Sequence, residues 1–160
     1  MTQIDPYKPE DLEDILAVTL RSWAPVFQLM REDIPDYVYN AFYPQGWRAR
    51  QTADVKATCL DRETELWVAR TDDRVSGYLG LRVHVEDAIG EVYIIAVDPA
   101  FQRQGIGGDL LTFALDWMRE RNLKIALVET GDDRGHAAAR ARYEKAGFER
   151  YPVARYFKRL

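Results

Sequence analysis

The sequence predicts an α/β protein with a mixed, mostly antiparallel sheet. Residues 65–70 and 75–85 have the alternation of strands, and Asp72-Asp73 between them is typical of a tight turn. Residues 91–97 form a dense apolar run, as in a central strand covered on both faces. Apolar stripes with helical spacing precede and follow these strands. Because strands and helices alternate around a central hairpin, we expect a mixed sheet and not the parallel sheet of a dinucleotide-binding fold.

The N-terminal part of the chain is expected to hold a short strand and several helices. Residues 3–7 have the pattern of the strand, and Pro9 with the two acids after it is typical of a first helical turn. The helix that follows has an apolar stripe of Leu12, Ile15, Leu16, Thr19 and Leu20. Between Trp23 and Trp47 we expect the helical pattern to be broken by Pro25, Pro35 and Pro44. A further helix is expected over residues 48–60.

The C-terminal part is expected to continue the alternation of helix and strand. A helix carries the apolar stripe of Leu110, Leu111, Ala114, Leu115 and Met118 and ends near Asn122. Residues 124–129 have the composition of another buried strand, and residues 136–145 that of a short helix with Gly147 as its C-cap. Two closing strands are expected over residues 148–151 and 154–157.

Composition limits the class of protein. The chain has 160 residues, of which 47% are apolar and 30% charged, as in one ordinary globular domain. No apolar run approaches the ~20 residues that a membrane helix needs. A single cysteine, Cys59, excludes an internal disulfide framework, and two histidines argue against a histidine-rich metal site. We therefore expect a cytoplasmic protein with no metal and no membrane partner.

Charge is distributed unevenly along the chain. The formal net charge is −4, but residues 134–160 alone carry +6. This asymmetry fits either a solvated surface or a basic region that serves an anionic ligand, and composition does not decide between them. Because the overall balance is not strongly positive and no groove-reading motif is present, we expect no nucleic-acid partner.

One glycine-rich segment has the pattern of an anion-binding loop. Between the predicted strand at residues 91–97 and the following helix, the chain reads Gln102-Arg103-Gln104-Gly105-Ile106-Gly107-Gly108. Glycine allows the backbone to approach a ligand, and the first N–H groups of a helix lack internal partners, so the segment could hold a phosphate or pyrophosphate. Arg103 could add a charge-assisted contact. A glycine-rich turn without a ligand remains the alternative.

Two motifs together resemble the GNAT superfamily of N-acetyltransferases. The first is Val97-Asp98-Pro99-x-x-Gln102-x-x-Gly105-x-Gly107, and the second is Tyr143-Glu144-Lys145-Ala146-Gly147-Phe148. The resemblance covers residues 65–150 closely and the N-terminal helices loosely. It implies a single N-acetyltransferase domain over residues 1–160, with helices on both faces of the sheet. Residues 1–64 would form variable acceptor-side helices, residues 65–150 the acetyl-CoA-binding core, and residues 151–160 a closing strand.

The resemblance also implies how acetyl-CoA, the co-substrate, would be bound. The amides of Gln102, Arg103, Gln104, Gly105, Ile106, Gly107 and Gly108 would cradle its pyrophosphate. The strand end at Ile95, Ala96 and Val97 would pair with the pantetheine arm, and an amide near Val97 would polarise the acetyl carbonyl. The strands that carry Val97 and Val128 would splay apart to admit the thioester. The family often has asparagine seven residues before the tyrosine of the second motif, and here His136 stands at that position.

Direct transfer to an amine needs a base, an oxyanion donor and an acid. A lysine-like amine with a pKa near ~10.4 arrives protonated, so its proton must be removed before attack. Glu91 is the candidate base, because the resemblance gives the base to a glutamate fourteen residues before Gly105; a surface carboxylate is the alternative. Strand alternation puts Glu91 and Val97 on one face, ~20 Å apart, so a bulge or a water relay would be needed. Tyr143 is the candidate acid, and packing in the core is its alternative.

The aromatic segment from Trp23 to Trp47 is the candidate acceptor wall. Its Tyr and Trp rings, with Glu32, Asp33 and Asp36 close in sequence, could hold a cation, although plain helix packing explains the aromatics equally. We therefore expect an N-acetyltransferase that acts on a primary amine of a small cationic molecule in a ternary complex. The alternatives are a protein N-terminal or lysine acetyltransferase and a non-catalytic acyl-CoA sensor. A homodimer is possible.

Overall fold

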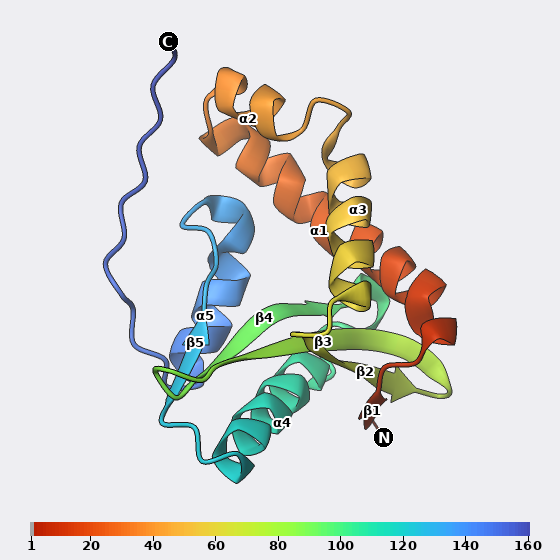
Figure 1. Ribbon diagram of the computed structural model, residues 1–160. Helices are drawn as coiled ribbons and strands as arrows, with labels where there is room; N and C mark the ends of the chain where they lie inside the picture. The colour runs from red at the N-terminus through yellow and green to blue at the C-terminus, as the bar shows by residue number, and fades with distance from the viewer. Residues whose placement is uncertain (1) are drawn as a thin grey trace. The chain divides into compact units, whose positions relative to one another are not determined.

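The computed structural model describes residues 2–160, which form one five-stranded sheet with helices (Figure 1). The strands are β1 (Gln3–Pro6), β2 (Glu65–Thr71), β3 (Arg74–His84), β4 (Ile89–Val97) and β5 (Ile125–Val128). The helices are α1 (Leu12–Asp33), α2 (Asp36–Phe42), α3 (Trp47–Leu60), α4 (Ile106–Glu120) and α5 (Ala137–Lys145). Three short 3-10 turns, η1 (Pro9–Asp11), η2 (Pro99–Phe101) and η3 (Arg134–His136), precede α1, the glycine-rich loop and α5.

The sheet has the order β1-β2-β3-β4-β5. Neighbouring strands from β1 to β4 are antiparallel, and β5 alone runs parallel to its neighbour β4. The prediction of a mixed, mostly antiparallel sheet is therefore confirmed.

The chain divides into two compact units. The first extends to Ser22 and includes residues 51–129, with the whole sheet; the second consists of residues 23–50 and 130–160. Helices α1 and α3 contribute residues to both units. The single-domain organisation stays a prediction.

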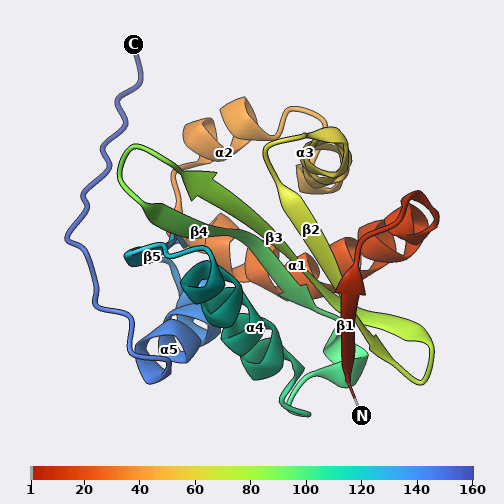
Figure 2. The same ribbon diagram turned by 60° about the horizontal axis from the view of Figure 1, so that its bottom comes forward.

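In the first unit, helices cover both faces of the sheet (Figure 2). On one face, the buried Tyr78 hydroxyl of β3 lies 2.7 Å from the hydroxyl of Thr19 in α1. On the other face, a Cβ built on Gly77 of β3 would lie 3.3 Å from Leu110 of α4. The run of buried residues 75–81 makes β3, and not β4, the most covered strand. The expectation that β4 is covered on both faces is wrong in part, because its Tyr93 is 41% exposed.

Helix α1 differs from the prediction, because it continues through Pro25 to Asp33. Proline has no N–H and so removes one hydrogen bond from a helix, here the bond to the carbonyl of Arg21. Burial of Ile15, Val18 and Phe27 along the same helix outweighs this loss. Pro35 does interrupt the helical pattern, since it lies between α1 and α2 and is the N-cap of α2.

The predicted turn chemistry is confirmed. Asp72 and Asp73 join β2 to β3 with φ values of 48° and 60°, the left-handed conformation that a tight two-residue hairpin turn requires. Gly147 has a φ of 89° just after α5, as expected for a glycine C-cap. Helix α4 ends at Glu120, and Asn122 follows in the left-handed region.

Three strand predictions near the C-terminus are wrong in whole or in part. Strand β5 is an edge strand and is not buried: its Ile125 is 56% exposed. Residues 148–151 and 154–157, including the closing strand expected within residues 151–160, form no strand. Alternating apolar residues make a strand only where a partner strand pairs with them, and these segments have none among residues 2–160.

No helix within residues 2–160 is both long enough and apolar enough to cross a bilayer.

Candidate active site

Strand β4 contains a bulge that changes which residues share a face. Its pairing with β3 shifts between Gly80↔Ile94 and Leu81↔Val92, so Tyr93 is an extra residue without a counterpart. A Cβ built on Gly90 would meet Met118 of α4, so Gly90 faces α4. Glu91, the next residue, therefore faces away from α4.

The predicted common face of Glu91 and Val97 is wrong for this reason. Val97 pairs with Gly77, whose Cβ direction points to Leu110 of α4, so Val97 lies on the α4 face. Regular alternation over six residues would have kept Glu91 on that face too. The one-residue bulge at Tyr93 reverses the alternation and turns Glu91 to the opposite face, the one on which α1 meets Tyr78.

Strands β4 and β5 separate beside this bulge. They pair only from Ile89↔Ile125 to Val92↔Val128, whereas β4 continues to Val97. The last five residues of β4 therefore have an edge that β5 does not cover. The sequence prediction that the strands carrying Val97 and Val128 diverge agrees with this register.

The backbone of β4 offers hydrogen-bonding groups to this opening. The Asp98 N–H donates to the Ser76 carbonyl at 2.9 Å, which fixes the alternation of the antiparallel ladder. By that alternation Ala96 bonds to β3, whereas Ile95 and Val97 direct their N–H and C=O groups away from β3. The Val97 carbonyl accepts a hydrogen bond from the Gln102 side chain at 3.2 Å. The N–H groups of Ile95 and Val97 and the carbonyl of Ile95 are thus directed to the side where a ligand could extend the sheet.

The glycine-rich loop follows directly and opens α4. Gly105 is the N-cap with a φ of 89°, and Arg103 also has a positive φ of 62°. The N–H groups of Ile106 and Gly107 come before the first N–H that donates within α4. They therefore have no acceptor in the helix and can donate to a ligand. The Gly108 N–H instead donates to the Gly105 carbonyl at 2.8 Å. The loop therefore supplies fewer free amides than the motif suggested.

Glu91 forms a close pair that the sequence reading did not find. One oxygen of its carboxylate lies 2.7 Å from Nε2 of His84 on β3. The Glu91 side chain is 15% exposed and that of His84 is 45% exposed, so the pair lies at the edge of solvent. The position of His84 diagonal to Glu91 depends on the hairpin register, which a single sequence does not fix.

Arg82 lies next to this pair, and its guanidinium is hydrogen-bonded to other residues. Arg82, directly opposite Glu91 in the ladder, donates to Asp61 at 3.0 Å and to the Thr64 hydroxyl at 2.8 Å. Its guanidinium also lies 3.3 Å from the centroid of the Tyr93 ring. Arg82 thus supports the bulge, and its hydrogen bonds go to residues other than Glu91.

Tyr143 lies in the second unit, on α5, and is buried. Burial raises the pKa of its hydroxyl above the ordinary value near 10, against a smaller lowering by Arg142. Its ring meets Phe148 edge-on with centroids 6.0 Å apart. Among residues 2–160 its hydroxyl has no hydrogen-bond partner, so this proton remains available to a ligand.

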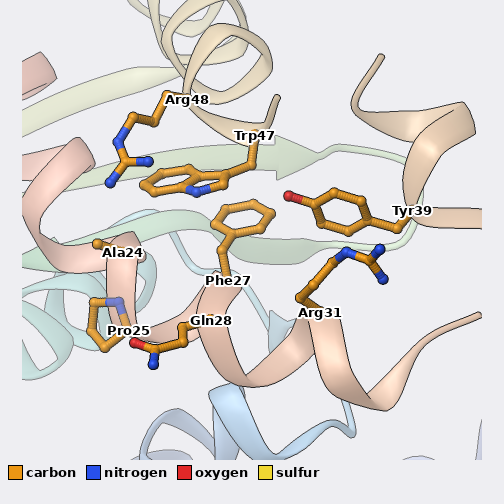
Figure 3. Close-up of a pocket in the computed structure, with 8 residues that line it drawn as sticks. All are labelled: Ala24, Pro25, Phe27, Gln28, Arg31, Tyr39, Trp47 and Arg48. Atoms are coloured by element: carbon orange, nitrogen blue, oxygen red, sulfur yellow. The ribbon is translucent and has the colours of Figure 1, made fainter. Parts of the chain in front are cut away.

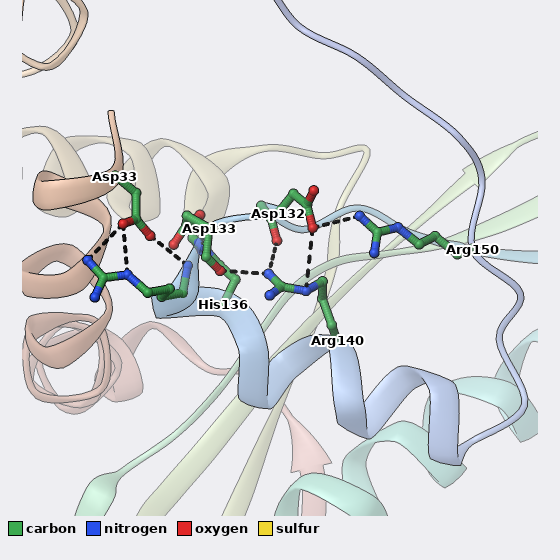
Figure 4. Close-up of polar contacts among 8 residues, drawn as sticks. Asp33, Asp132, Asp133, His136, Arg140 and Arg150 are labelled. Atoms are coloured by element: carbon green, nitrogen blue, oxygen red, sulfur yellow. Dashed lines mark hydrogen bonds and ion pairs between the residues drawn. The ribbon is translucent and has the colours of Figure 1, made fainter. Parts of the chain in front are cut away.

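His136 belongs to a loop that many contacts fix in place (Figure 4). Its Nδ1 lies 2.7 Å from Oδ2 of Asp133. Arg140 donates to the carbonyls of Gly131 and Asp133, both at 2.7 Å. A Cβ on Gly131 would lie 2.3 Å from the Asp133 carboxylate, so a larger residue there would displace that side chain. One ring nitrogen of His136 is therefore occupied, and contact with a cofactor would use the other.

The acids of the expected acceptor wall are all paired with arginine. Arg134 donates to Asp33 through its backbone N–H at 2.9 Å and through its side chain at 2.8 Å, and it also reaches Glu32 at 3.0 Å. The backbone hydrogen bond from Arg134, with further help from the guanidinium, holds the pKa of Asp33 below its usual range. Asp36 accepts from Arg31 at 2.6 Å. These carboxylates do not form the open cation site that the sequence suggested.

The same unit contains a cavity of about 560 Å³ between α1, α2 and the start of α3 (Figure 3). Phe27 and Trp47 stack with centroids 4.5 Å apart and planes 12° from parallel. The guanidinium of Arg48 lies 4.6 Å from the Trp47 ring, and that of Arg31 lies 4.4 Å from the Tyr39 ring. The remaining lining residues are Ala24, Pro25 and Gln28. The aromatic segment therefore forms a hollow and not only packed core.

The sheet opening, the glycine-rich loop and the second motif are features of one family of acyltransferases. The model of the acetyltransferase (GNAT) family matches residues 23–148, and the chain belongs to this family. This confirms the resemblance seen in the two sequence motifs.

Several curated mycothiol acetyltransferases are similar in sequence to the chain. A mycothiol acetyltransferase of Rhodococcus opacus is 33% identical over 134 residues, which are 75% of this chain and 43% of that protein. A mycothiol acetyltransferase of Thermomonospora curvata is 38% identical over 88 residues, 55% of this chain and 29% of that protein. The chain thus spans less than half the length of these curated relatives.

Solved structures share the fold. The ribosomal-protein-S18-alanine N-acetyltransferase of Escherichia coli has a TM-score of 0.70 and 21% identity, covering 95% of this chain and 80% of that one. The PaiA N-acetyltransferase of Thermoplasma acidophilum, in complex with coenzyme A, has a TM-score of 0.70 and 16% identity, covering 96% and 93%. At these identities the likeness concerns the fold alone.

Proposed function

We propose that the protein transfers an acetyl group from acetyl-CoA to the amine of an acceptor, by direct attack in a ternary complex. The observation that carries this proposal is the edge of β4 beyond Val92, which β5 leaves uncovered beside Ile95 and Val97. An extended pantetheine arm has amides that can pair with such an edge. Family membership and the free amides at the start of α4 add support.

In this reaction Glu91 accepts the amine proton through a water chain. Two observations favour a relay over direct contact: Glu91 faces away from α4, and it bonds to His84. The neutral amine then attacks the acetyl carbon and forms a C–N bond, while the carbonyl electrons move to its oxygen. The attacking nitrogen is then positively charged and loses its second proton to solvent water before the intermediate collapses. The Val97 N–H is the proposed donor to this oxyanion.

Collapse of the tetrahedral intermediate breaks the C–S bond and releases the CoA thiolate. Tyr143 donates its hydroxyl proton to this sulfur and is reprotonated from solvent. Because burial raises the pKa of Tyr143, the side chain carries its proton at neutral pH, as an acid must. In the same proposal His136 contacts the cofactor through its free ring nitrogen.

The acceptor is proposed only as an amine. The three carboxylates that suggested a cationic substrate are paired with Arg134 and Arg31, so they give no support to that narrower class. We propose a cytoplasmic reaction, since the single Cys59 indicates no disulfide framework.

The test is release of CoA thiol from acetyl-CoA in the presence of amines, with acetyl-CoA binding measured by calorimetry alongside. The panel contains polyamines, amino acids, aminoglycosides and peptides with a free N-terminus or lysine. Amine-dependent thiol release supports the proposal. Binding of acetyl-CoA without release for any amine contradicts it and indicates an acyl-CoA sensor; release with peptides only indicates a protein acetyltransferase.

A further inference from the structure

The charged side chains that line the cavity of the second unit are all positive. Of the eight residues that line it, Arg31 and Arg48 are the only charged ones, and both are cations. Figure 3 shows their guanidinium groups at opposite ends of the Phe27–Trp47 pair. The cavity therefore combines an aromatic wall with positive charge at two ends.

The two arginines differ in how far they are neutralised. Arg31 gives one N–H to Asp36, whose side chain is 80% exposed, and such a surface pair is weak. Arg48 has no carboxylate partner among residues 2–160. Its contact with the Trp47 face restrains the guanidinium plane but leaves its N–H groups free. Arg48 is thus an exposed cation that lies against the Trp47 ring and has no carboxylate partner among the residues described.

Of the three nearby acids, only Asp36 offsets part of this charge, through its exposed pair with Arg31. Glu32 and Asp33 are held by Arg134, and Asp36 by Arg31. The other polar groups of the lining are the Gln28 amide, the Tyr39 hydroxyl and the Trp47 indole N–H, and all three are neutral. A cationic ligand would meet two like charges here, whereas a carboxylate could accept two parallel hydrogen bonds from Arg48.

We infer that this cavity binds a carboxylate on a molecule with an aromatic or apolar body, and that this molecule is the amine acceptor. Binding of a carboxylate does not depend on the proposed function; only the statement that this molecule is the amine acceptor rests on it. The donor-binding features are the edge of β4 and the glycine-rich loop, so recognition of the acceptor falls to another part of the chain. The aromatic wall of Phe27 and Trp47 accounts for the apolar body, and Arg48 for the carboxylate.

The test uses three small probes of one shape in calorimetric titrations without acetyl-CoA: phenylacetate, its neutral amide phenylacetamide, and the cation phenethylamine. Phenylacetate is expected to bind at least ~10-fold more tightly than phenylacetamide, because charge-assisted hydrogen bonds contribute more than neutral ones. Phenethylamine is expected to bind most weakly. Equal binding of the acid and the amide, or preference for the amine, would overturn the inference.

Variants at position 48 locate the effect. R48Q should weaken phenylacetate binding by ~10-fold or more and leave the Kd for acetyl-CoA unchanged. R62Q, which removes an exposed arginine outside the cavity, is the matched control and should bind phenylacetate like the wild type. R48E should reverse the preference toward phenethylamine. Circular dichroism checks that each variant is folded; wild-type phenylacetate binding by a folded R48Q protein would exclude the site.

Turnover separates this inference from the proposed function. With phenylalanine, its methyl ester and phenethylamine as amines, kcat/KM should be highest for phenylalanine, and R48Q should remove that preference through KM. Carboxylate binding without thiol release from any amine contradicts the proposed function but supports the anion site. Thiol release with no preference for the carboxylate supports the proposed function and overturns this inference.

Discussion

Arg21 and Asp98 join helix α1 to the chain directly after strand β4, at the start of the glycine-rich loop. Asp98 is 2% exposed, and one of its carboxylate oxygens accepts from Nε of Arg21 at 3.0 Å. The other oxygen accepts from the N–H of Ala100 at 2.9 Å and so caps the 3-10 turn. The position of the loop therefore depends on a carboxylate that must be ionised to make both contacts well.

Stability should depend on the ionisation of Asp98. Burial alone would raise its pKa, but the hydrogen bonds from Arg21 and Ala100 outweigh burial and hold the pKa below the ordinary value. The ionised Asp98 therefore contributes its full share to the free energy of unfolding above the unfolded-state pKa near ~3.9. This contribution is lost as the pH falls through the lower pKa of the folded state. In urea unfolding, D98N should cost about 1–2 kcal/mol at pH 7 and progressively less below pH ~4.

Asp116 provides the control for this prediction. It pairs with Arg119 at 2.6 Å on α4, but both side chains are more than half exposed. D116N should therefore change the free energy of unfolding by no more than about 0.5 kcal/mol. Equal effects of D98N and D116N, or an effect of D98N that persists at pH 2, would contradict the role given to the buried carboxylate.

Gly105 and Gly147 offer a matched pair for testing the loop. Both have a φ of 89°, and a Cβ built on either would meet no other atom within 4 Å. G105A and G147A should therefore cost a similar amount of stability, about 1–2 kcal/mol, because each puts a side chain in the left-handed region. Only G105A should also weaken acetyl-CoA binding, measured by calorimetry, since the loop amides it displaces are proposed to hold the pyrophosphate.

A result in which both glycine variants weaken acetyl-CoA binding equally would point to general destabilisation. A result in which neither does would remove the loop from the proposed cofactor site. G108A separates the amides further, because the Gly108 N–H already donates to the Gly105 carbonyl. That variant should leave acetyl-CoA binding unchanged.

Local chemistry made the turns and the loop predictable. Asp72 and Asp73 tolerate the left-handed conformation, and glycine is the usual residue at a position such as Gly147, so short-range rules located both features. The divergence of the strands beside Val97 followed from the family resemblance. These features depend on a few neighbouring residues or on a motif.

What the sequence did not predict depends on distant partners. The bulge at Tyr93 is defined by its register against Gly80 and Leu81, and it reversed the face assigned to Glu91. Asp33 was read as a free acid because Arg134, 101 residues later, is its partner only in the fold. Residues 154–157 alternate like a strand, but no strand within residues 2–160 pairs with them. A single sequence does not reveal these pairings.

Glu91 and His84 should act together if Glu91 is the base. E91Q removes the proton acceptor, so kcat should fall by ~10²-fold or more, and the rise of rate with pH should disappear. H84Q keeps a hydrogen-bonding side chain but not the imidazole, and it should lower kcat less than E91Q does, without abolishing turnover. The measurements are pH–rate profiles of thiol release.

E86Q is the control for the Glu91 prediction, because Glu86 is an exposed glutamate in the turn of the same hairpin. It should have the wild-type profile. An E91Q enzyme with the wild-type rate and pH dependence would leave Glu91 as a surface carboxylate paired with His84.

Tyr143→Phe should separate catalysis from packing. The Tyr143 hydroxyl has no hydrogen-bond partner among residues 2–160, so its removal should change the free energy of unfolding by less than about 0.5 kcal/mol. Loss of the acid should lower kcat by ~10²-fold or more while the KM for acetyl-CoA changes little. Because burial raises the pKa of Tyr143, the wild-type rate should not fall through loss of this proton until the pH exceeds the ordinary tyrosine value near ~10. Y151F, at an 82% exposed tyrosine of the same unit, is the control; unchanged turnover in Y143F would assign Tyr143 to the core alone.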